Sequence, residues 1–199
     1  MSVRKRDDDG VENVLIISHT EKSTAFFTKM LNAASCNQIV VLKSCGGARR
    51  LLLEQDFDLV IINAPLHDES GESLSRHISS KGISQVILLV KSEYFDEVSA
   101  VCEDDGILVV AKPVNRAIFW SALKLAKSSF SRLKNMQTEN SRLKQEIVDI
   151  RVIDRAKCLL ISYLNMSEQD AHRYIEKQAM NMRVTKRVIA DGILKTYES

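Results

Sequence analysis

The sequence predicts an α/β fold with a doubly wound parallel sheet, followed by an all-helical second part. Apolar runs rich in Val, Ile and Leu occupy 14–18, 39–44, 59–63, 86–90 and 107–111. Stretches with helical spacing separate them, at about 21–34, 46–55, 70–80 and 94–103. Short, almost continuously apolar strands that alternate with amphipathic helices are typical of βαβ units, whose sheet is covered on both faces. We therefore expect a (βα)5 unit with right-handed crossovers.

A single long helix is predicted after Pro113, because no Gly or Pro occurs from about 115 to 162. Its apolar residues are spaced alternately by four and three, which is typical of a coiled-coil seam. They form two blocks, Phe119, Leu123, Ala126, Phe130 and Leu133, then Leu143, Ile147 and Ile150. Leu133 and Leu143 are ten positions apart, three more than a heptad, so we expect a stammer near Met136.

This helix predicts a homodimer through a parallel coiled coil at 119–150. Asn140 falls at an a position, where a single buried Asn favours two parallel strands. The expected contact residues are Leu123, Phe130, Leu133, Asn140, Leu143, Ile147 and Ile150. The alternative is that the stripe packs on the helix's own domain.

Two further helices are predicted near the C-terminus. The first follows Ser167, a good N-cap with Asp170 placed as in a capping box, and the second opens at Thr185. Together with the end of the long helix they should form a three-helix module, because each apolar face is too narrow to be stable alone. The apolar residues expected inside include Tyr174, Met182 and Val188.

Charge divides the chain into an acidic and a basic part. Residues 1–115 carry 12 Lys and Arg against 17 Asp and Glu, a net of −5, whereas 116–199 carry 16 against 9, a net of +7. This asymmetry suggests that only the second part meets a polyanion.

Other features exclude several classes of protein. The longest apolar runs are about five residues, too short to span a membrane. Residues 1–12 lack an apolar segment typical of a secretory signal, so we expect a disordered tail and reduced thiols in the cytoplasm. The four Cys and four His have no metal-ligand spacing, and no set of residues typical of an enzyme is visible. We therefore expect no catalytic residue, metal or other cofactor.

Residues 13–127 resemble the receiver domain of response regulators, which implies the strand order 2-1-3-4-5. Gly71, eight residues after Asn63, and Lys112-Pro113 after the fifth strand match the receiver pattern. Receivers place two acidic residues after the first strand, where this chain has Ser18 and His19. Further departures are Asn63 in place of the phosphoacceptor Asp and Val90 in place of Thr or Ser.

These departures predict a pseudo-receiver without phosphoryl chemistry. Ser18, His19 and Asn63 supply no formal negative charge, whereas Mg²⁺ prefers carboxylate oxygen. An amide also does not attack phosphorus as a carboxylate does. Asp68 could substitute in principle, but we expect it to be a solvated turn residue. Lys112 either hydrogen-bonds Asn63 or His19, or is inherited without a present role.

Residues 153–194 resemble the ANTAR module, named for transcription antitermination. The match includes Asp154-Arg155-Ala156-Lys157, the Met-Ser-Glu-x-x-Ala run at 166–171, and Ala179-Met180. We assign 145–199 to this domain, and the resemblance implies binding of paired hairpins in a nascent leader transcript. The expected RNA contacts are Arg155, Lys157, Arg173, Lys177, Gln178, Arg183, Lys186 and Arg187.

Two other functions remain open from the sequence. The last two helices could form a helix-turn-helix of a DNA-binding regulator, although no glycine marks the turn. The basic surface could instead bind an acidic protein, which would make the chain an interaction scaffold. For the RNA-binding function, three kinds of control could replace phosphorylation: a partner protein on the pseudo-receiver, a small ligand, or constitutive dimerisation with control by abundance.

Overall fold

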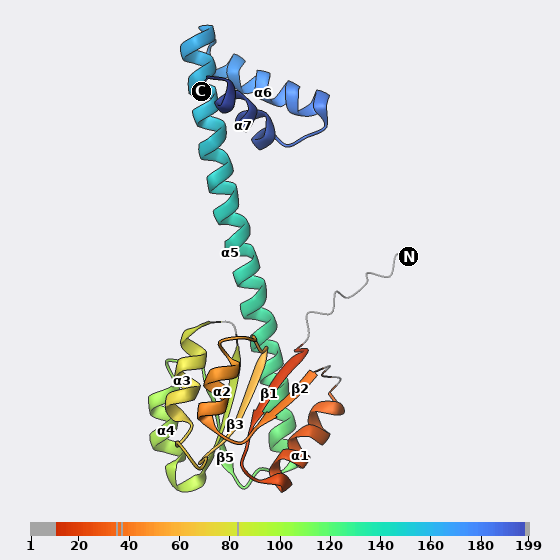
Figure 1. The fold of residues 1–199 in the computed structure, drawn as a ribbon, viewed down its shortest axis with the longest axis vertical. Coiled ribbons are helices and arrows are strands. Elements are labelled where there is room, and N and C mark those ends of the chain that lie inside the picture. Colours follow the sequence, from red (N-terminus) through yellow and green to blue (C-terminus); the bar gives the residue numbers. More distant parts are fainter. Residues whose placement is uncertain (1–10, 35, 37, 83, 198–199) are drawn as a thin grey trace. The chain divides into compact units, whose positions relative to one another are not determined.

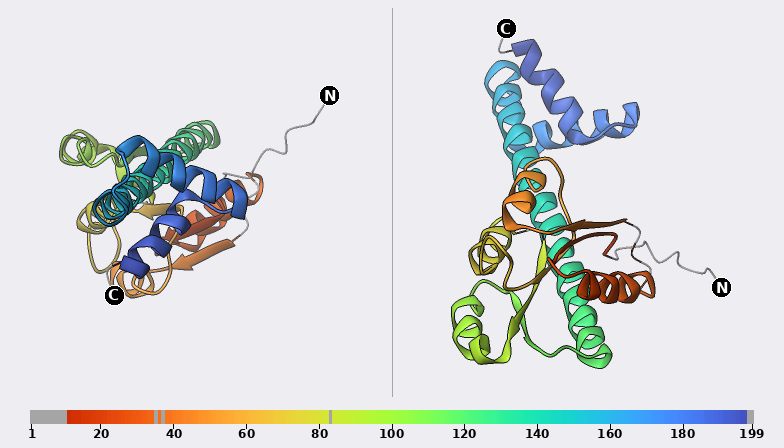
Figure 2. Two further views of the ribbon diagram at one scale, coloured as in Figure 1. Left: turned by 90° about the horizontal axis from the view of Figure 1, so that it is seen from above. Right: turned by 60° about the horizontal axis from the view of Figure 1, so that its bottom comes forward.

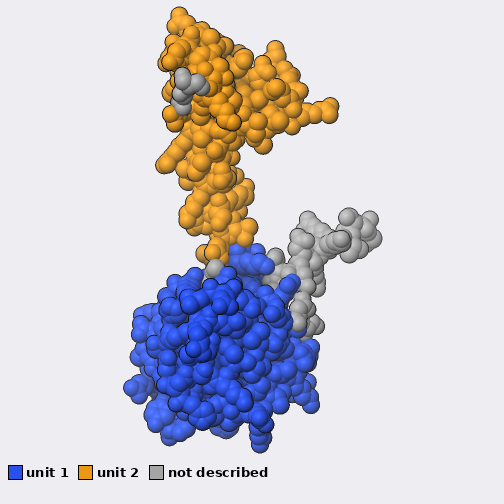
Figure 3. All heavy atoms as spheres, viewed as in Figure 1, with its two compact units in different colours: residues 1–135 blue, residues 136–199 orange. Residues whose placement is uncertain are grey.

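A computed structural model of the chain describes residues 11–34, 36, 38–82 and 84–197. It contains two compact units, residues 1–135 and 136–199 (Figure 3). Residues 1–10 of the predicted tail lie outside the described part of the chain, whereas Val11 is buried in the core of the first unit.

The first unit contains the predicted parallel sheet, in the order β2-β1-β3-β4-β5 (Figure 1). Its strands are β1 (Asn13–Ile17), β2 (Gln38–Leu42), β3 (Leu59–Asn63), β4 (Gln85–Lys91) and β5 (Leu108–Lys112). The helices between them are α1 (Glu21–Asn32), α2 (Cys45–Leu51), α3 (Glu72–Ser80) and α4 (Phe95–Cys102), with a 3₁₀ turn, η1 (Ser92–Tyr94), before α4. The predicted fold class and strand order are confirmed.

Helices cover both faces of this sheet (Figure 2). One core forms where α1 and the start of the long helix α5 (Arg116–Leu164) pack on one face. The other core lies under α2, α3 and α4. The central strand β3 is buried along its whole length, which explains why its sequence is continuously apolar up to Asn63.

Gly71 is required by the backbone at the start of α3. Its φ is +89°, in the left-handed region that L side chains rarely adopt. A Cβ there would also lie 2.8 Å from Cγ2 of Ile62. The glycine therefore allows the loop after β3 to turn tightly over the end of the strand.

The start of α5 is part of the first unit's own core, which corrects the dimer prediction for two residues. Leu123 and Phe130 are 1% and 3% exposed and pack beside Phe119 and α1. The apolar stripe here faces the chain's own sheet, so these two residues are not available to a second copy. From Leu133 onward the predicted seam is exposed, with Leu143, Ile147 and Ile150 between 47% and 58% accessible.

The second unit is the predicted three-helix module. The end of α5 packs with α6 (Glu168–Met182) and α7 (Lys186–Tyr197) around Ala156, Leu160, Ile175 and Ala190. Ser167 caps α6 by accepting a hydrogen bond from the backbone N–H of Asp170 at 3.1 Å. Three residues expected inside are exposed instead: Tyr174 at 39%, Met182 at 65% and Val188 at 53%. The small core is formed by other residues, namely Ala156, Leu160, Ala171, Ile175, Ala190 and Ile193, and these three lie outside it. None of the described helices is long and apolar enough to span a membrane.

Candidate functional site

The predicted degenerate phosphorylation site lies at the carboxyl end of the sheet in the first unit. Asn63 at the end of β3 is 5% exposed and Ser18, after β1, is 1% exposed. The Asn63 side-chain amide donates to Oγ of Ser18 at 3.0 Å and to Oγ1 of Thr20 at 3.4 Å. The amide thus joins the loops after β1 and β3 through neutral groups and offers no carboxylate to a cation.

Lys112 also lies at this edge, but its partner differs from the predicted ones. Its ammonium donates to the backbone carbonyl of Ala64, in the loop directly after Asn63. Burial lowers the pKa of Lys112 from its usual value, and the nearby charge of Lys91 lowers it further. Val90, at the fourth position of the site, is buried at the end of β4 and brings no hydroxyl.

The structure brings together two histidines that are far apart in the sequence. The rings of His19 and His67 lie 4.6 Å apart between centroids, tilted by 59°. Nδ1 of His19 is buried without a hydrogen-bond partner in the described part of the chain. No sequence pattern indicates this pair, because the two residues follow different strands.

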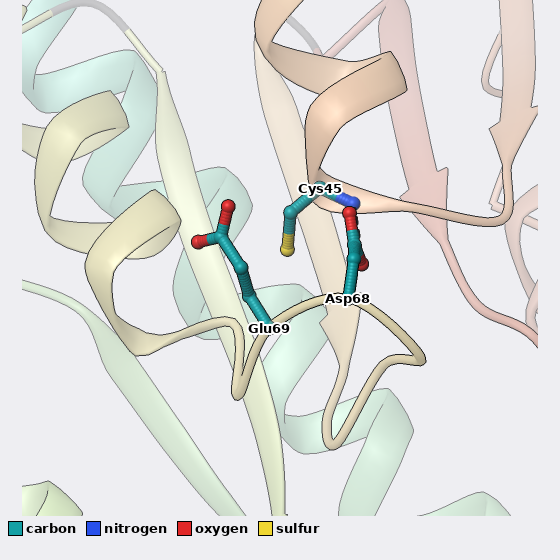
Figure 4. Close-up of side chains that lie close together, drawn as sticks. All are labelled: Cys45, Asp68 and Glu69. Atoms are coloured by element: carbon teal, nitrogen blue, oxygen red, sulfur yellow. Dashed lines mark hydrogen bonds between the residues drawn. The ribbon is translucent and has the colours of Figure 1, made fainter.

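A second cluster next to this edge contains Cys45, Asp68 and Glu69 (Figure 4). Asp68 is exposed in the turn after β3, as expected, but it also has defined hydrogen-bond partners. Its carboxylate accepts hydrogen bonds from the backbone N–H groups of Cys45 at 3.1 Å and Gly46 at 2.9 Å, at the start of α2. These hydrogen bonds, that of Gly46 first, hold the pKa of the carboxyl below its usual value.

The interactions of this cluster are those of a structural contact between a loop and a helix rather than those of a metal centre. Glu69 forms an ion pair with Arg49 at 2.9 Å, so both carboxylates already have partners. Burial, together with the negative charges of Asp68 and Glu69, raises the pKa of the Cys45 thiol to about 12. A protonated thiol is a poor metal ligand. The cluster therefore fastens the loop after β3 to the start of α2.

In the second unit, three of the predicted RNA-binding cations are held by carboxylates of the same unit. Lys157 pairs with Asp154 at 2.8 Å and Glu168 at 3.1 Å. Lys186 pairs with Glu176. Arg187 pairs with Asp149 at 2.6 Å and Asp191 at 3.0 Å. The Arg187 pairs tie α7 to α5, which indicates a structural role.

Three other predicted cations are differently placed. Arg173 and Lys177 are exposed on α6, and Arg183 follows its end with a left-handed φ of 53°. In the described part of the chain none of these three has an ion pair. Residues 173 and 177 are one turn apart and share a helix face. Of the remaining predicted contacts, Arg155 is exposed and Gln178 is half-buried.

The same face of α6 carries an exposed apolar residue that sequence reasoning did not assign to the site. Met180, three residues after Lys177, is 79% exposed, the highest value among the large hydrophobic residues of the described chain. Its place in the Ala179-Met180 motif was visible in the sequence, but its exposure was not. Exposed apolar side chains at a polar surface are common at binding sites when they gather with other contacts.

Most of the positive charge of residues 116–199 lies outside the second unit. Of the net +7 in 116–199, +5 comes from 116–135, which belongs to the first unit. Residues 136–199 carry 11 Lys and Arg against 9 Asp and Glu. A surface on the second unit that binds a polyanion would therefore depend on the positions of a few cations and not on net charge.

Comparison with known families identifies the second unit. Residues 141–194 match the model of the ANTAR domain. Over 139 residues the chain is 27% identical to the "Transcriptional regulatory protein PdtaR" of Mycobacterium tuberculosis, in a match that covers 70% of this chain and 68% of that protein.

Solved structures show that the first unit has the receiver fold. A response regulator receiver domain protein from Clostridium thermocellum matches with a TM-score of 0.54 and 19% identity, over 63% of this chain and 99% of that one. The signal receiver domain of an HD domain-containing protein from Pseudomonas fluorescens matches with a TM-score of 0.53 and 21% identity, over 71% and 98%. The chain therefore consists of a unit with the receiver fold followed by an ANTAR domain.

Proposed function

We propose that this protein is a non-enzymatic regulator of transcription that binds stem-loops of nascent RNA through its ANTAR domain. Binding of paired hairpins in a leader transcript would prevent a terminator from forming. The observation that supports this most is the position of the unpaired cations on the matched domain. Arg173 and Lys177 share the exposed face of α6, and Arg183 follows at its end.

This face of α6 can contact both phosphates and bases, so it suits RNA better than it suits a polyanion that has no bases. Arg and Lys can neutralise phosphates, and Arg can also stack on bases that are splayed out of a loop. Met180 and Tyr174 add apolar and aromatic surface on α6. Single-stranded loops expose both phosphates and base faces, so such a mixed surface fits them. We place the RNA contacts on α6 and the turn after it.

Dimerisation is part of the proposal. Without the buried Leu123 and Phe130, the predicted seam still has five exposed residues on α5. They are Leu133, Asn140, Leu143, Ile147 and Ile150. A parallel pairing along this stretch would hold two ANTAR domains on one assembly. Two hairpins on one transcript would then bind with a high effective concentration.

The unpaired cations define a direct test of RNA binding. The full chain is used to enrich RNAs from a pool with two tandem stem-loops and randomised loops, and affinity is measured by fluorescence anisotropy. The variant R173A/K177A/R183N should lose at least about tenfold in affinity, because it removes three charged contacts. Asn is chosen at 183 because it tolerates the left-handed backbone.

The control removes the same kind of charge from elsewhere. Lys29 and Lys81 are exposed in the first unit, and K29A/K81A should bind the enriched RNA as the wild type does. Circular dichroism and the oligomeric state should be unchanged in both variants. Failure to enrich stem-loops, or equal affinity for duplex DNA of the same sequence, would contradict RNA binding and favour the DNA-binding alternative.

A further inference from the structure

A pocket of about 260 Å³ lies beside the carboxyl end of β3 in the receiver-fold unit. Its polar lining includes Lys22, Asn63 and Lys112, and its apolar lining includes Phe26, Phe27 and Val114. None of the described residues that line it is Asp or Glu. Apolar walls with a few convergent polar groups are the usual form of a small-molecule site.

The two lysines give this pocket an unbalanced positive charge. In the described part of the chain neither Lys22 nor Lys112 has an ion pair. The Lys112 ammonium donates to the carbonyl of Ala64, which uses one of its three N–H groups and leaves two for a ligand. Burial disfavours the charged form of Lys112 and lowers its pKa. An anion beside the ammonium would stabilise the charged form again, in place of the water that burial removes.

The start of α1 adds to this positive potential. Thr20 precedes the helix, but its hydroxyl accepts from Asn63 and makes no capping hydrogen bond. The first N–H groups of α1 therefore lack a side-chain cap, and Lys22 and Ser23 of this turn line the pocket. The amino end of a helix carries partial positive charge. Glu21 of the same turn lines the neighbouring pocket instead.

We propose that this pocket binds a small organic anion with a carboxylate group and an apolar body. The carboxylate would lie between Lys22 and Lys112, and the body would contact Phe26, Phe27 and Val114. An inorganic anion would engage the lysines but leave the apolar walls unused, so the lining favours an organic one. This inference does not rest on RNA binding, because it concerns the other unit.

Binding is tested on the full chain with a pair of small probes. Benzoate combines a carboxylate with an aromatic ring, and benzamide has nearly the same shape without the charge. Calorimetric titration, with ¹H–¹³C methyl spectra to locate the site, should give saturable millimolar binding of benzoate and shifts at Val114. Benzamide should show no saturation in the same concentration range.

Three lysine variants assign the binding to this pocket. K112M keeps the length of the side chain and should weaken benzoate at least about tenfold, as expected for loss of a charged hydrogen bond. Lys22 is exposed, so K22M should fold normally and weaken benzoate binding by a smaller factor. It therefore tests the pocket even if K112M does not fold. K43M removes a lysine that lines the neighbouring pocket and should leave benzoate binding unchanged.

Several outcomes would overturn the proposal. Absence of saturable benzoate binding, or wild-type affinity in both K112M and K22M, would show that the pocket is not an anion site. Equal affinity for sulfate would show that the apolar walls play no part. Binding of N-acetyl-aspartate amide without binding of benzoate would assign the pocket to an acidic side chain of a partner protein instead.

Discussion

The Asn63 side chain connects two loops at the carboxyl end of the sheet, but it lacks the negative charge that phosphoryl transfer requires. Its amide donates to Ser18 and Thr20, so the loops after β1 and β3 are joined by hydrogen bonds between neutral groups. The ammonium of Lys112, which lines the same pocket, donates to the carbonyl of Ala64 and not to Asn63. Neutral hydrogen bonds avoid the cost of burying an unpaired charge.

This arrangement predicts that the first unit does not accept a phosphoryl group. Incubation of the full chain with acetyl phosphate and Mg²⁺ should leave its intact mass unchanged, because Ser18, His19 and Asn63 provide no carboxylate for the metal or the nucleophile. A receiver domain with a complete acidic site serves as the positive control. A stable adduct of about 80 Da that maps to Asp68 would show that this interpretation is wrong.

Asp68 is predicted to stabilise the first unit through the start of α2. Asp68→Ala leaves the N–H groups of Cys45 and Gly46 without their acceptor, so the free energy of unfolding should fall by on the order of 1 kcal/mol, as for other capping residues. Urea denaturation measures this decrease. Asp56→Ala, at an exposed carboxylate in the same unit, is the matched control and should have little effect.

The effect of Asp68 should depend on pH in a defined direction. Its pKa is lowered in the folded state, so the ionised carboxyl contributes stability above the unfolded-state pKa of about 4. This contribution is lost as the pH falls through the folded-state pKa. The difference between wild type and Asp68→Ala should therefore shrink as the pH falls below about 4, and a difference that grows would contradict the assignment.

At the scale of elements, α5 contains two different apolar surfaces in one helix. Up to Phe130 its stripe packs on the sheet. From Leu133 the exposed residues Met136, Leu143, Ile147 and Ile150 join Asn140 in spacings of three and four. Leu133 therefore belongs with the second block, and the irregular spacing lies where the packing on the sheet ends. We infer that the second stretch alone forms the dimer seam.

This predicts a dimer that depends on the second stretch of α5. Ile147→Asp places a carboxylate at an a position and should shift the full chain toward monomer in sedimentation equilibrium, because like charges would face each other in the seam. Gln145→Asp adds the same charge two residues away, at an f position, and should leave the dimer intact. Equal behaviour of the two variants would argue against this seam.

At the scale of the whole molecule, the proposed functions belong to two units that differ in charge. The receiver-fold unit has an acidic composition outside α5, and the ANTAR unit has a nearly balanced one. RNA affinity should consequently depend on a few local contacts rather than on net charge. This distinction can be measured through the dependence of affinity on salt.

The salt dependence should report the number of phosphates that α6 contacts. For each phosphate that the protein no longer neutralises, the slope of log K against log salt should decrease by about 0.7 to 0.9. R173A/K177A should therefore reduce the slope by between one and two. K29A/K81A, which removes two charges from the first unit, should not change it, and an equal decrease in both variants would point to a diffuse charge effect.

The sequence by itself determined the order of the strands and helices, the substitutions at the phosphorylation site and the presence of an ANTAR domain. These are encoded by local periodicity and by motifs of fixed spacing, which do not depend on distant contacts. Strand bounds agree to within one or two residues, because the apolar runs stop at polar residues such as Asn63, the last residue of β3.

Only the tertiary structure decided which surfaces those residues occupy. A spacing of three and four looks the same whether a helix packs on its own sheet, as at Phe130, or remains exposed, as at Ile147. Likewise a set of basic residues does not reveal that Arg187 is paired with Asp149 while Arg173 lies without an ion pair in the described chain. Burial and ion pairing join residues far apart in the sequence, so they follow from packing and not from local pattern.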